Sequence, residues 1–439
     1  MSERYYRIKG GIPLDGIVEV LGAKNAVSKQ LVASVLTNKT CIFTNVPPIA
    51  EITQVLEMLS EIGSQYEWLS HHTLKIQTPE IKKNEIDQKF QKYTRIPILF
   101  LGPLLGRTGR AKVPIPGGCK IGSRPVDFHI AAVEAMGAKI TATDTHFEVS
   151  ASLGLKGTNI NLAYPSVGAT ENVIFCSVVA NGKTIINNAA IEPEIIDTIN
   201  CLNKMVAQVK VRLENRHIEI DGRQELKGTV HHAITDRIEA ASFAIAAVAT
   251  DGFVTVKNAQ AEYLSSFLGT LTKIGGQFST QDGCIIFFRK DSKLKPTHIE
   301  TDVHPGFMTD WQQPFTVMLT QADGTSVIHE TVYEKRFGYA ETLARMGADI
   351  NVVTYCLGKK PCRFYGRDFE HSCVIKGPSK LRASNIEIPD LRAGFAHIIA
   401  ALIADGTSNI YGINLLERGY ASVPERLRNI GAQIEEREC

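Results

Sequence analysis

The sequence has no long hydrophobic run and no excess of charge of one sign. No apolar stretch in its 439 residues approaches the roughly 18 residues that suggest a membrane-spanning helix. The opening Met-Ser-Glu-Arg-Tyr-Tyr does not resemble a signal peptide, so we expect a cytosolic protein with no membrane partner. The formal net charge is only +2, whereas nucleic-acid-binding domains carry a concentrated basic face. A nucleic-acid partner is therefore not expected.

Cysteine pairs with metal-ligand spacing are also missing. No two cysteines form a Cys-x-x-Cys motif, and the nine lie scattered at positions 41, 119, 176, 201, 284, 356, 362, 373 and 439. This pattern argues against a disulfide framework and against a structural zinc site, and we expect no metal and no cofactor. Most cysteines, such as Cys41 and Cys176, lie in apolar segments where a buried, inert thiol is expected. The histidine pairs 71–72 and 231–232 lack ligand spacing and are expected in solvated turns.

Cys119 differs from the other cysteines in its surroundings. It lies in the segment Pro116-Gly-Gly-Cys-Lys-Ile-Gly-Ser-Arg124, beside Lys120. Glycines let the backbone approach a ligand closely, and a thiol near cations can act as an acid or a nucleophile. From this composition alone, a tight turn and a reactive thiol are equally good interpretations.

One short phrase recurs six times along the chain. An apolar residue and two or three variable residues precede Ile or Met, and then glycine and a β-branched run follow. The glycine position of each copy is 63, 137, 206, 275, 347 or 431, with Val206 as the one departure. The phrase is typical of a helix that ends in a glycine cap before a strand. Upstream phrases such as Asp251-Gly and Asp405-Gly predict turns that open strands.

Apolar runs such as 240–250 and 394–404 precede these turns. They are apolar nearly all round, which predicts buried helices. A chain of this length is too long for one ordinary core, and units of about 70 residues are longer than the usual solenoid repeat. We therefore predict an α/β protein of two domains, each with a threefold pseudo-repeat.

Seven motifs, in order along the whole chain, carry a family resemblance. They are Gly22-Ala-Lys24-Asn25-Ala, Pro116-Gly-Gly-Cys119 through Arg124-Pro-Val-Asp-Phe-His129, Pro165-Ser-Val-Gly-Ala-Thr170, Thr309-Asp310, Glu330-Thr-Val-Tyr-Glu-Lys-Arg336, Asp390-Leu-Arg392 and Glu417-Arg418-Gly-Tyr. With them the chain resembles the UDP-N-acetylglucosamine 1-carboxyvinyltransferases, the enolpyruvyl transferases that open bacterial peptidoglycan synthesis. The resemblance implies two inside-out α/β domains with central helices and outer sheets. It places one domain at 23–232 and the other at 233–439, completed by residues 1–22. The active site is expected between them, with the Cys119 loop as a lid.

The implied reaction moves the enolpyruvyl group of phosphoenolpyruvate onto the 3-hydroxyl of UDP-N-acetylglucosamine and releases phosphate. By resemblance, Cys119 donates the proton and Asp310 acts as base or orienter at the sugar hydroxyl. Asp310 also fits an N-cap of a helix that begins near Trp311. Lys24, Arg124 and Arg418 match the positions that hold phosphoenolpyruvate.

The remaining substrate-binding residues also come from the resemblance. Arg336 and Arg392 are expected to line the same cleft. The expected contacts to the nucleotide sugar are Asn25, Arg95, Pro125, Val126, Asp127, Phe128, Tyr164, Pro165, Ser166, Val167, Val332 and Asp390. Ser166 opens an apolar stretch, so backbone N–H groups at a helix N-terminus suit the diphosphate, and a plain N-cap is the alternative.

Two residues depart from the family pattern near the acceptor. Tyr164 stands where some members have lysine, and Trp311 is bulkier than the usual aliphatic residue. They leave open a sister enolpyruvyl transferase that acts on another nucleotide or on shikimate 3-phosphate. The shikimate enzyme shares the fold and lacks this cysteine loop, which disfavours it. A catalytically silent repeat protein is the other alternative. The presence of five residues together argues against it: Lys24, Cys119, Arg124, Asp310 and Arg418.

Overall fold

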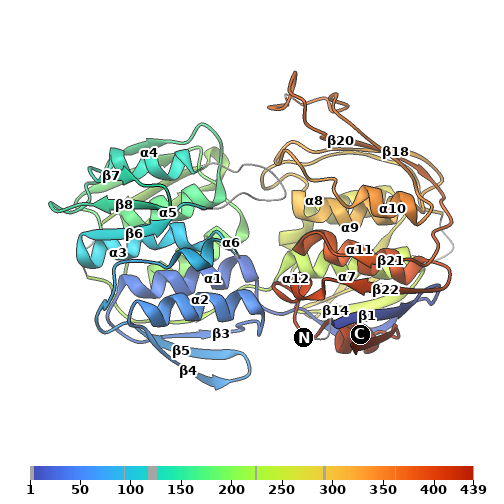
Figure 1. The fold of residues 1–439 in the computed structure, drawn as a ribbon, viewed down its shortest axis with the longest axis horizontal. Coiled ribbons are helices and arrows are strands. Elements are labelled where there is room, and N and C mark those ends of the chain that lie inside the picture. Colours follow the sequence, from blue (N-terminus) through green and yellow to red (C-terminus); the bar gives the residue numbers. More distant parts are fainter. Residues whose placement is uncertain are drawn as a thin grey trace. The chain divides into compact units, whose positions relative to one another are not determined.

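The fold is given by a computed structural model that describes residues 4–92, 94–116, 126–222, 225–289, 293–360 and 362–438. These residues form two compact units (Figure 1). The first unit contains residues 22–116 and 126–234, and the second contains residues 4–21 and 235–438. The start of the chain thus belongs to the same unit as its end.

The first unit alternates helices with short strands. Its helices are α1 (Lys24–Ala33), α2 (Ala50–Glu61), α3 (Leu101–Thr108), α4 (Asp127–Ala135), α5 (Val167–Ser177) and α6 (Pro193–Lys204). Its strands are β3 (Cys41–Thr44), β4 (Gln65–Ser70), β5 (Thr73–Gln77), β6 (Arg110–Pro114), β7 (Lys139–Ala142), β8 (His146–Ser150), β9 (Asn159–Asn161), β10 (Lys183–Asn187), β11 (Gln208–Arg212), β12 (His217–Asp221) and β13 (Val230–His232).

The second unit repeats this alternation. Its helices are α7 (Arg237–Ala249), α8 (Ser265–Lys273), α9 (Thr309–Leu319), α10 (Ala340–Arg345), α11 (Leu391–Ile403), α12 (Ile413–Glu417) and α13 (Val423–Arg428). Its strands are β1 (Arg4–Lys9), β2 (Asp15–Glu19), β14 (Phe253–Lys257), β15 (Gln277–Gln281), β16 (Cys284–Phe288), β17 (His298–Glu300), β18 (Gly324–His329), β19 (Asp349–Val353), β20 (Ser372–Gly377), β21 (Asn385–Glu387), β22 (Thr407–Tyr411) and β23 (Gln433–Glu438).

The described strands form three small sheets in each unit, and the pairing pattern repeats. In the second unit the strand orders are β15-β16-β14-β2, β17-β18-β20-β19 and β21-β22-β1-β23. The first unit has β13-β3-β5-β4, β11-β12-β10-β9 and the shorter β6-β8-β7. In each four-stranded sheet one outer strand pairs in parallel and the other neighbours pair antiparallel. The sheets therefore carry the predicted sixfold repeat.

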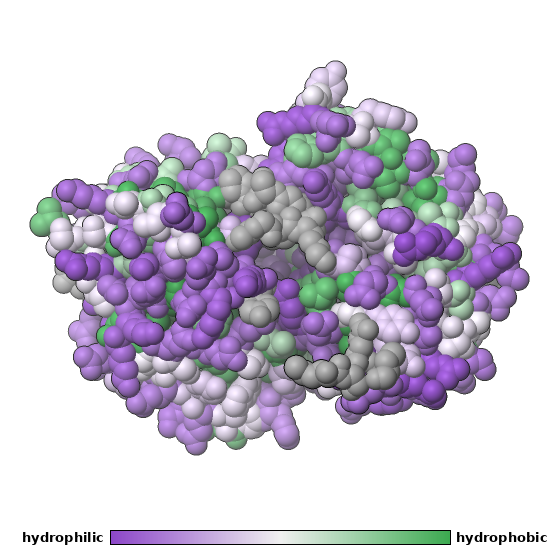
Figure 2. All heavy atoms as spheres, viewed as in Figure 1, coloured by the Kyte–Doolittle hydropathy of each residue, from purple (hydrophilic) through white to green (hydrophobic). Residues whose placement is uncertain are grey.

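Buried helices form the centre of each unit. In Figure 1, α7, α9 and α11 lie in the middle of the second unit, with β18 and β20 on one side and β1 and β14 on the other. All thirteen residues of α7 are buried, and its many alanines let neighbouring helices approach closely. The face of the molecule in Figure 2 is mostly hydrophilic. The family-derived expectation of central helices and outer sheets is thus confirmed.

No helix within the described ranges is long and apolar enough to cross a membrane.

The glycine positions of the six repeats share one backbone conformation. The residues at 63, 137, 275, 347 and 431 are glycines with φ between 85° and 111°. Val206 takes φ 67° at the equivalent position. A side chain with a branched β-carbon is strained in this region, whereas glycine is not. The phrase found in the sequence therefore marks a helix end that requires positive φ, and Val206 meets the same requirement at a cost.

Two substitutions test this cost. Gly137 has φ 92°, and no described atom outside its chain neighbours lies within 4 Å of a Cβ built there. We expect Gly137→Ala to destabilise the protein by about 1–2 kcal/mol through backbone strain alone. Val206→Gly is expected to stabilise it by up to about 1 kcal/mol, because relief of strain exceeds the added entropy of the unfolded chain. The midpoints of urea unfolding measure the change in stability of both variants. An unchanged midpoint for Gly137→Ala would contradict the strain argument.

Candidate active site

Asp310 forms the centre of a charged cluster in the second unit. Arg336 donates from Nη2 to Asp310 Oδ1, and Arg392 donates from Nε to Asp310 Oδ2 at 3.1 Å. The Arg336 and Arg392 side chains are only 3% and 7% exposed, whereas Asp310 is 15% exposed. We call these three residues the Asp310 cluster. Charge-assisted hydrogen bonds to both oxygens hold the carboxylate in one orientation.

The predicted N-cap role of Asp310 is wrong. Helix α9 begins at Thr309, with Met308 as its N-cap residue. Asp310 therefore lies inside the first turn, and its oxygens bind arginine side chains. Sequence pattern alone suggested a helix start two residues too late, and the arginines come from distant segments.

Asp390 and Tyr420 position Arg392. Asp390 is the N-cap of α11, and its Oδ1 accepts from the backbone N–H groups of Arg392 at 2.9 Å and Ala393 at 3.1 Å. The Arg392 guanidinium lies 6.0 Å from the centre of the Tyr420 ring. Burial lowers the pKa of Arg392, but the charge of Asp310 raises it, and the net shift is upward. Arg392 thus stays charged beside Asp310.

Glu330 is a positioning residue that the sequence analysis did not select. Its Oε2 accepts from Thr309 Oγ1 at 2.8 Å in α9, and its Oε1 accepts from the backbone N–H of Val332 at 2.8 Å. Glu330 is fully buried, and burial raises its pKa, although Arg336 opposes the shift. It ties the segment that carries Val332 and Arg336 to the start of α9. The sequence could have indicated Glu330, because this residue begins the family motif that ends at Arg336.

Arg418 lies close in the fold to the start of α11. It is the half-buried C-cap residue of α12. A Cβ on the next residue, Gly419, would lie 2.9 Å from Leu391, the residue before Arg392. The structure therefore brings the chain segments of Arg418 and Arg392 together, as the family motifs suggested.

Trp311 does not take part in this cluster. Its side chain is 1% exposed and packs against Phe267 and Phe307, with ring centres 5.6 and 5.5 Å away. Adjacent residues of a helix do not share a face, so Trp311 enters the core while Asp310 meets the arginines. Trp311 is thus a core residue of this unit, on a different face of α9 from Asp310.

In the first unit, Lys24 lies at the start of α1 and forms a buried ion pair. Its Nζ is 3.1 Å from both carboxylate oxygens of Glu51 in α2, and the two residues are 8% and 5% exposed. Asn25, the next residue, is half-buried. The sequence analysis did not select Glu51 as the partner of Lys24.

The segments 126–128 and 164–167 are brought together in this unit. The first opens α4 and the second opens α5. A Cβ on Gly168 would lie 3.2 Å from His129, which places the two helix starts side by side. Ser166 is the N-cap of α5, accepting from the backbone N–H of Ala169 at 3.4 Å. The predicted helix start is confirmed, and two positive helix ends lie near each other.

For several other predicted site residues, the structure gives the burial of the side chain. Tyr164 and Pro165 are half-buried, and Asp127 and Val167 are exposed. Arg95 is half-buried at the start of a 3₁₀ turn, Ile96–Phe100. Cys119, Arg124 and Pro125 lie outside the described residues.

The prediction that His231 lies in a solvated turn is wrong. It lies in β13, is 2% exposed, and its Nε2 is 3.0 Å from Asp197 Oδ1. Asp197 Oδ2 also accepts from Gln30 Nε2 at 2.7 Å. His231 is thus part of a buried hydrogen-bond network and not a solvated turn residue.

Comparison with known families shows which family the chain belongs to. The model of the EPSP synthase (3-phosphoshikimate 1-carboxyvinyltransferase) family matches residues 8–427. The chain belongs to the EPSP synthase family. Within this family, the chain is 49% identical to the UDP-N-acetylglucosamine 1-carboxyvinyltransferase of Protochlamydia amoebophila, over 98% of this chain and 93% of that protein. It is 47% identical to the protein of the same name from Chlamydia abortus, with 97% and 96% covered.

Solved structures show the same fold for this EPSP synthase family member. The enolpyruvyl transferase NikO from Streptomyces tendae superposes with a TM-score of 0.87 at 19% identity, with each chain covered completely. EPSP synthase from Acinetobacter baumannii gives a TM-score of 0.76 at 18% identity, with 99% of this chain and 100% of that chain covered.

Proposed function

We propose that this chain transfers the enolpyruvyl group of phosphoenolpyruvate to the 3-hydroxyl of UDP-N-acetylglucosamine, with release of phosphate. This reaction is the first committed step of peptidoglycan synthesis, and so serves cell-wall formation, cell shape and division. The carrying observation is the near-full-length identity of 49% to a UDP-N-acetylglucosamine 1-carboxyvinyltransferase. The Asp310 cluster supports the proposal, because it presents one partly exposed carboxylate held by two arginines.

The reaction needs an acid for the methylene carbon and an acceptor for the hydroxyl proton. Cys119 is the proposed acid, since a free thiol pKa of about 8.5 leaves it mostly protonated at neutral pH and readily ionised. Asp310 is the proposed base or orienter at the sugar hydroxyl. Its two arginine hydrogen bonds fix the direction of the carboxylate, as proton transfer requires.

The cations divide into two groups in this proposal. Arg336 and Arg392 hold Asp310 and balance its charge, so we assign them mainly to positioning. Lys24, Arg124 and Arg418 are proposed to hold the carboxylate and phosphate of phosphoenolpyruvate. Lys24 and Glu51 are paired, and the approach of an anionic substrate would compete with Glu51 for the ammonium group.

The nucleotide sugar is proposed to use the helix starts of α4 and α5. Segments 126–128 and 164–167 lie side by side there, and backbone N–H groups at helix N-termini favour a diphosphate. Asn25, Arg95 and Pro125 are proposed as further contacts from the first unit. Val332 and Asp390 are proposed contacts from the second unit. Glu330 holds the backbone N–H of Val332, and the backbone N–H of Arg392 holds the carboxylate of Asp390.

A phosphate-release assay tests the proposed reaction. The purified chain is mixed with phosphoenolpyruvate and one acceptor at a time: UDP-N-acetylglucosamine, UMP or shikimate 3-phosphate. We expect phosphate release that depends on UDP-N-acetylglucosamine and a product of matching mass. Release with UMP or shikimate 3-phosphate alone would reject the proposed acceptor, and no release with any acceptor would support a silent protein.

A further inference from the structure

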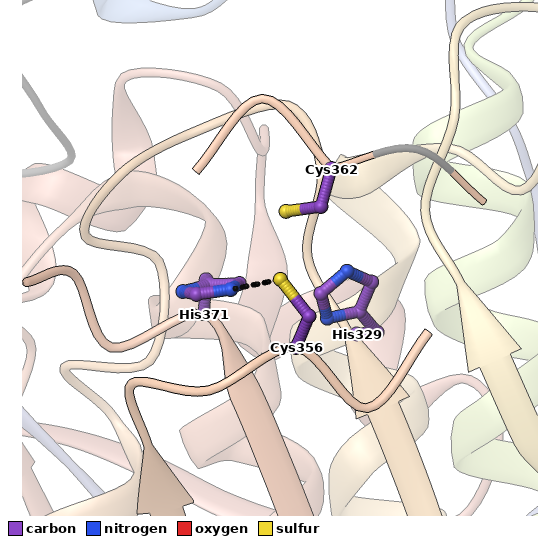
Figure 3. A group of neighbouring side chains, drawn as sticks. All are labelled: His329, Cys356, Cys362 and His371. Carbon is purple, nitrogen blue, oxygen red and sulfur yellow. Dashed lines mark hydrogen bonds between the residues drawn. The ribbon is translucent and has the colours of Figure 1, made fainter. Parts of the chain in front are cut away.

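Two cysteines and two histidines converge in the second unit, in a group that the proposed reaction does not use. They are His329, Cys356, Cys362 and His371, and one ligand atom from each lies within 4.8 Å of all the others. Cys356 Sγ is 3.2 Å from His371 Nε2. Figure 3 shows Cys356 between the two histidine rings, with Cys362 approaching from another part of the loop. We call these residues the Cys2His2 cluster.

The loop that carries the cluster is an addition to the repeated fold. Antiparallel hairpins at equivalent places in the repeats close through residues 71–72, 143–145, 213–216 and 282–283. The hairpin of β19 and β20 closes only through residues 354–371. Connections longer than about 12–15 residues without helix or strand are uncommon and are usually functional or disordered. Four other copies show that the hairpin itself does not need this loop.

Hydrogen bonds leave one nitrogen of each histidine available to a ligand. His371 Nδ1 is 2.5 Å from the Phe369 carbonyl oxygen, which only accepts, so Nδ1 carries the proton and Nε2 presents its lone pair toward Cys356. His329 Nδ1 bonds Ser372 Oγ at 2.8 Å. His329 Nε2 is fully buried and has no hydrogen-bond partner among the described residues. Metal-binding histidines are typically oriented through the second nitrogen in this way.

The backbone of the loop supports the same centre. The Phe364 N–H lies 3.4 Å from Cys362 Sγ, a contact that suits a thiolate. Glu300 accepts from the backbone N–H groups of Lys359 at 2.8 Å and Lys360 at 2.9 Å. Gly358 passes so close to His329 that a Cβ there would lie 2.2 Å from the ring. The loop is thus held against His329 at several points.

The two histidines of the cluster are buried, and its two cysteines are half-buried. His329 and His371 are fully buried, and Phe364 is 1% exposed with its ring centre 5.7 Å from that of His371. Without a ligand, His329 Nε2 is a buried polar atom that has no hydrogen-bond partner among the described residues, whereas buried polar atoms normally have one.

We propose that the Cys2His2 cluster binds one Zn²⁺ ion as a structural site. Zinc favours four tetrahedral S and N ligands, at about 2.3 Å for sulfur and 2.0–2.1 Å for nitrogen, which gives ligand–ligand separations of about 3.3–3.8 Å. The observed group requires only small side-chain movements to reach these separations. Both thiols release their protons to solvent on binding, and the two thiolates neutralise the dication. Four protein ligands leave no open position, so the ion would stabilise the loop and take no part in catalysis.

The proposal differs from the expectation of no metal that came from the missing Cys-x-x-Cys motif. That expectation considered only cysteines close in sequence. Here His329 comes from the end of β18, and the other three ligands come from the loop 354–371, whose last residue is His371.

Metal content measured on the whole protein tests the site. Protein purified from zinc-supplemented cells is analysed by mass spectrometry of its metals, and we expect about one zinc per chain. The double variant Cys356→Ser/Cys362→Ser is expected to lose at least nine-tenths of it. Cys284→Ser is the matched control, because Cys284 is a half-buried thiol of the same unit outside the cluster, and it should keep its zinc.

A wild-type measurement keeps the test independent of variant folding and of enzyme activity. Metal-free protein titrated with Co²⁺ should show the intense visible absorption of tetrahedral cobalt with thiolate ligands, and Zn²⁺ should abolish it. Zinc is expected to raise the thermal midpoint of the metal-free wild type by roughly 5 °C or more. Wild type without zinc and without the cobalt spectrum would overturn the proposal. A Cys356–Cys362 disulfide in freshly purified protein, detected by mass, would also overturn it.

Discussion

Replacing Asp310 with asparagine is expected to lower the rate of phosphate release by about 10²–10⁴-fold, the usual contribution of a positioned acid or base. Asparagine keeps the shape of the side chain but removes the charge and one acceptor oxygen. Because Arg336 and Arg392 each donate to a different oxygen, the new NH₂ group would face one guanidinium donor. The loss should therefore appear in kcat more than in the KM for phosphoenolpyruvate.

A matched control separates this effect from a general loss of structure. Asp323→Asn makes the same change in the same unit, at a side chain that is 60% exposed and forms a surface ion pair with Lys293. Such pairs contribute little to stability, so its activity should equal that of the wild type. If Asp310→Asn retained more than half of the wild-type kcat, Asp310 would not be the base or orienter.

Cys119→Ala is expected to cause a comparable loss, because it removes the proposed acid. Cys119→Ser should be nearly as inactive, since a hydroxyl ionises far less readily than a thiol. Cys284→Ser serves as the control thiol. Phosphate release with UDP-N-acetylglucosamine measures all three, and full activity of Cys119→Ala would reject the role of the thiol.

Alkylation by an epoxide mimic of phosphoenolpyruvate gives a second, direct measurement on Cys119. The background from the buried cysteines should be small, because burial raises the pKa of Cys41 to about 11 and that of Cys176 to about 12. Burial also raises the pKa values of Cys201 and Cys373. A raised pKa leaves little thiolate at neutral pH. Peptide mapping should find one adduct, on Cys119, and an adduct elsewhere would contradict an activated thiol there.

Much of the fold was predictable because it repeats a local pattern. The six phrases marked helix ends with positive φ, and the structure confirms that conformation even at Val206. The apolar runs 240–250 and 394–404 predicted buried helices, and they correspond to α7 and α11. Such features depend on residues a few positions apart, so a single sequence shows them.

The environment of single side chains was less predictable. The sequence allowed an N-cap role for Asp310, left open an effect of Trp311 on the acceptor and placed His231 in a solvated turn. The structure puts Asp310 inside the first turn of α9, Trp311 in the core and His231 in a buried hydrogen-bond network. In each case a distant segment supplies the partner: Arg392 for Asp310, aromatic rings for Trp311, and Asp197 for His231. The local sequence pattern does not show which distant residue will contact a given side chain in the folded protein.

The sequence by itself determined the repeat, the α/β architecture and the family motifs that point to enolpyruvyl transfer. Only the tertiary structure decided how Asp310 is held, since its arginines lie 26 and 82 residues away in the chain. It also decided that His329 meets the cysteines of the loop 354–371. The physical reason is that helices and strands follow short-range periodicity, whereas these clusters form only when packing of the central helices and sheets closes long loops.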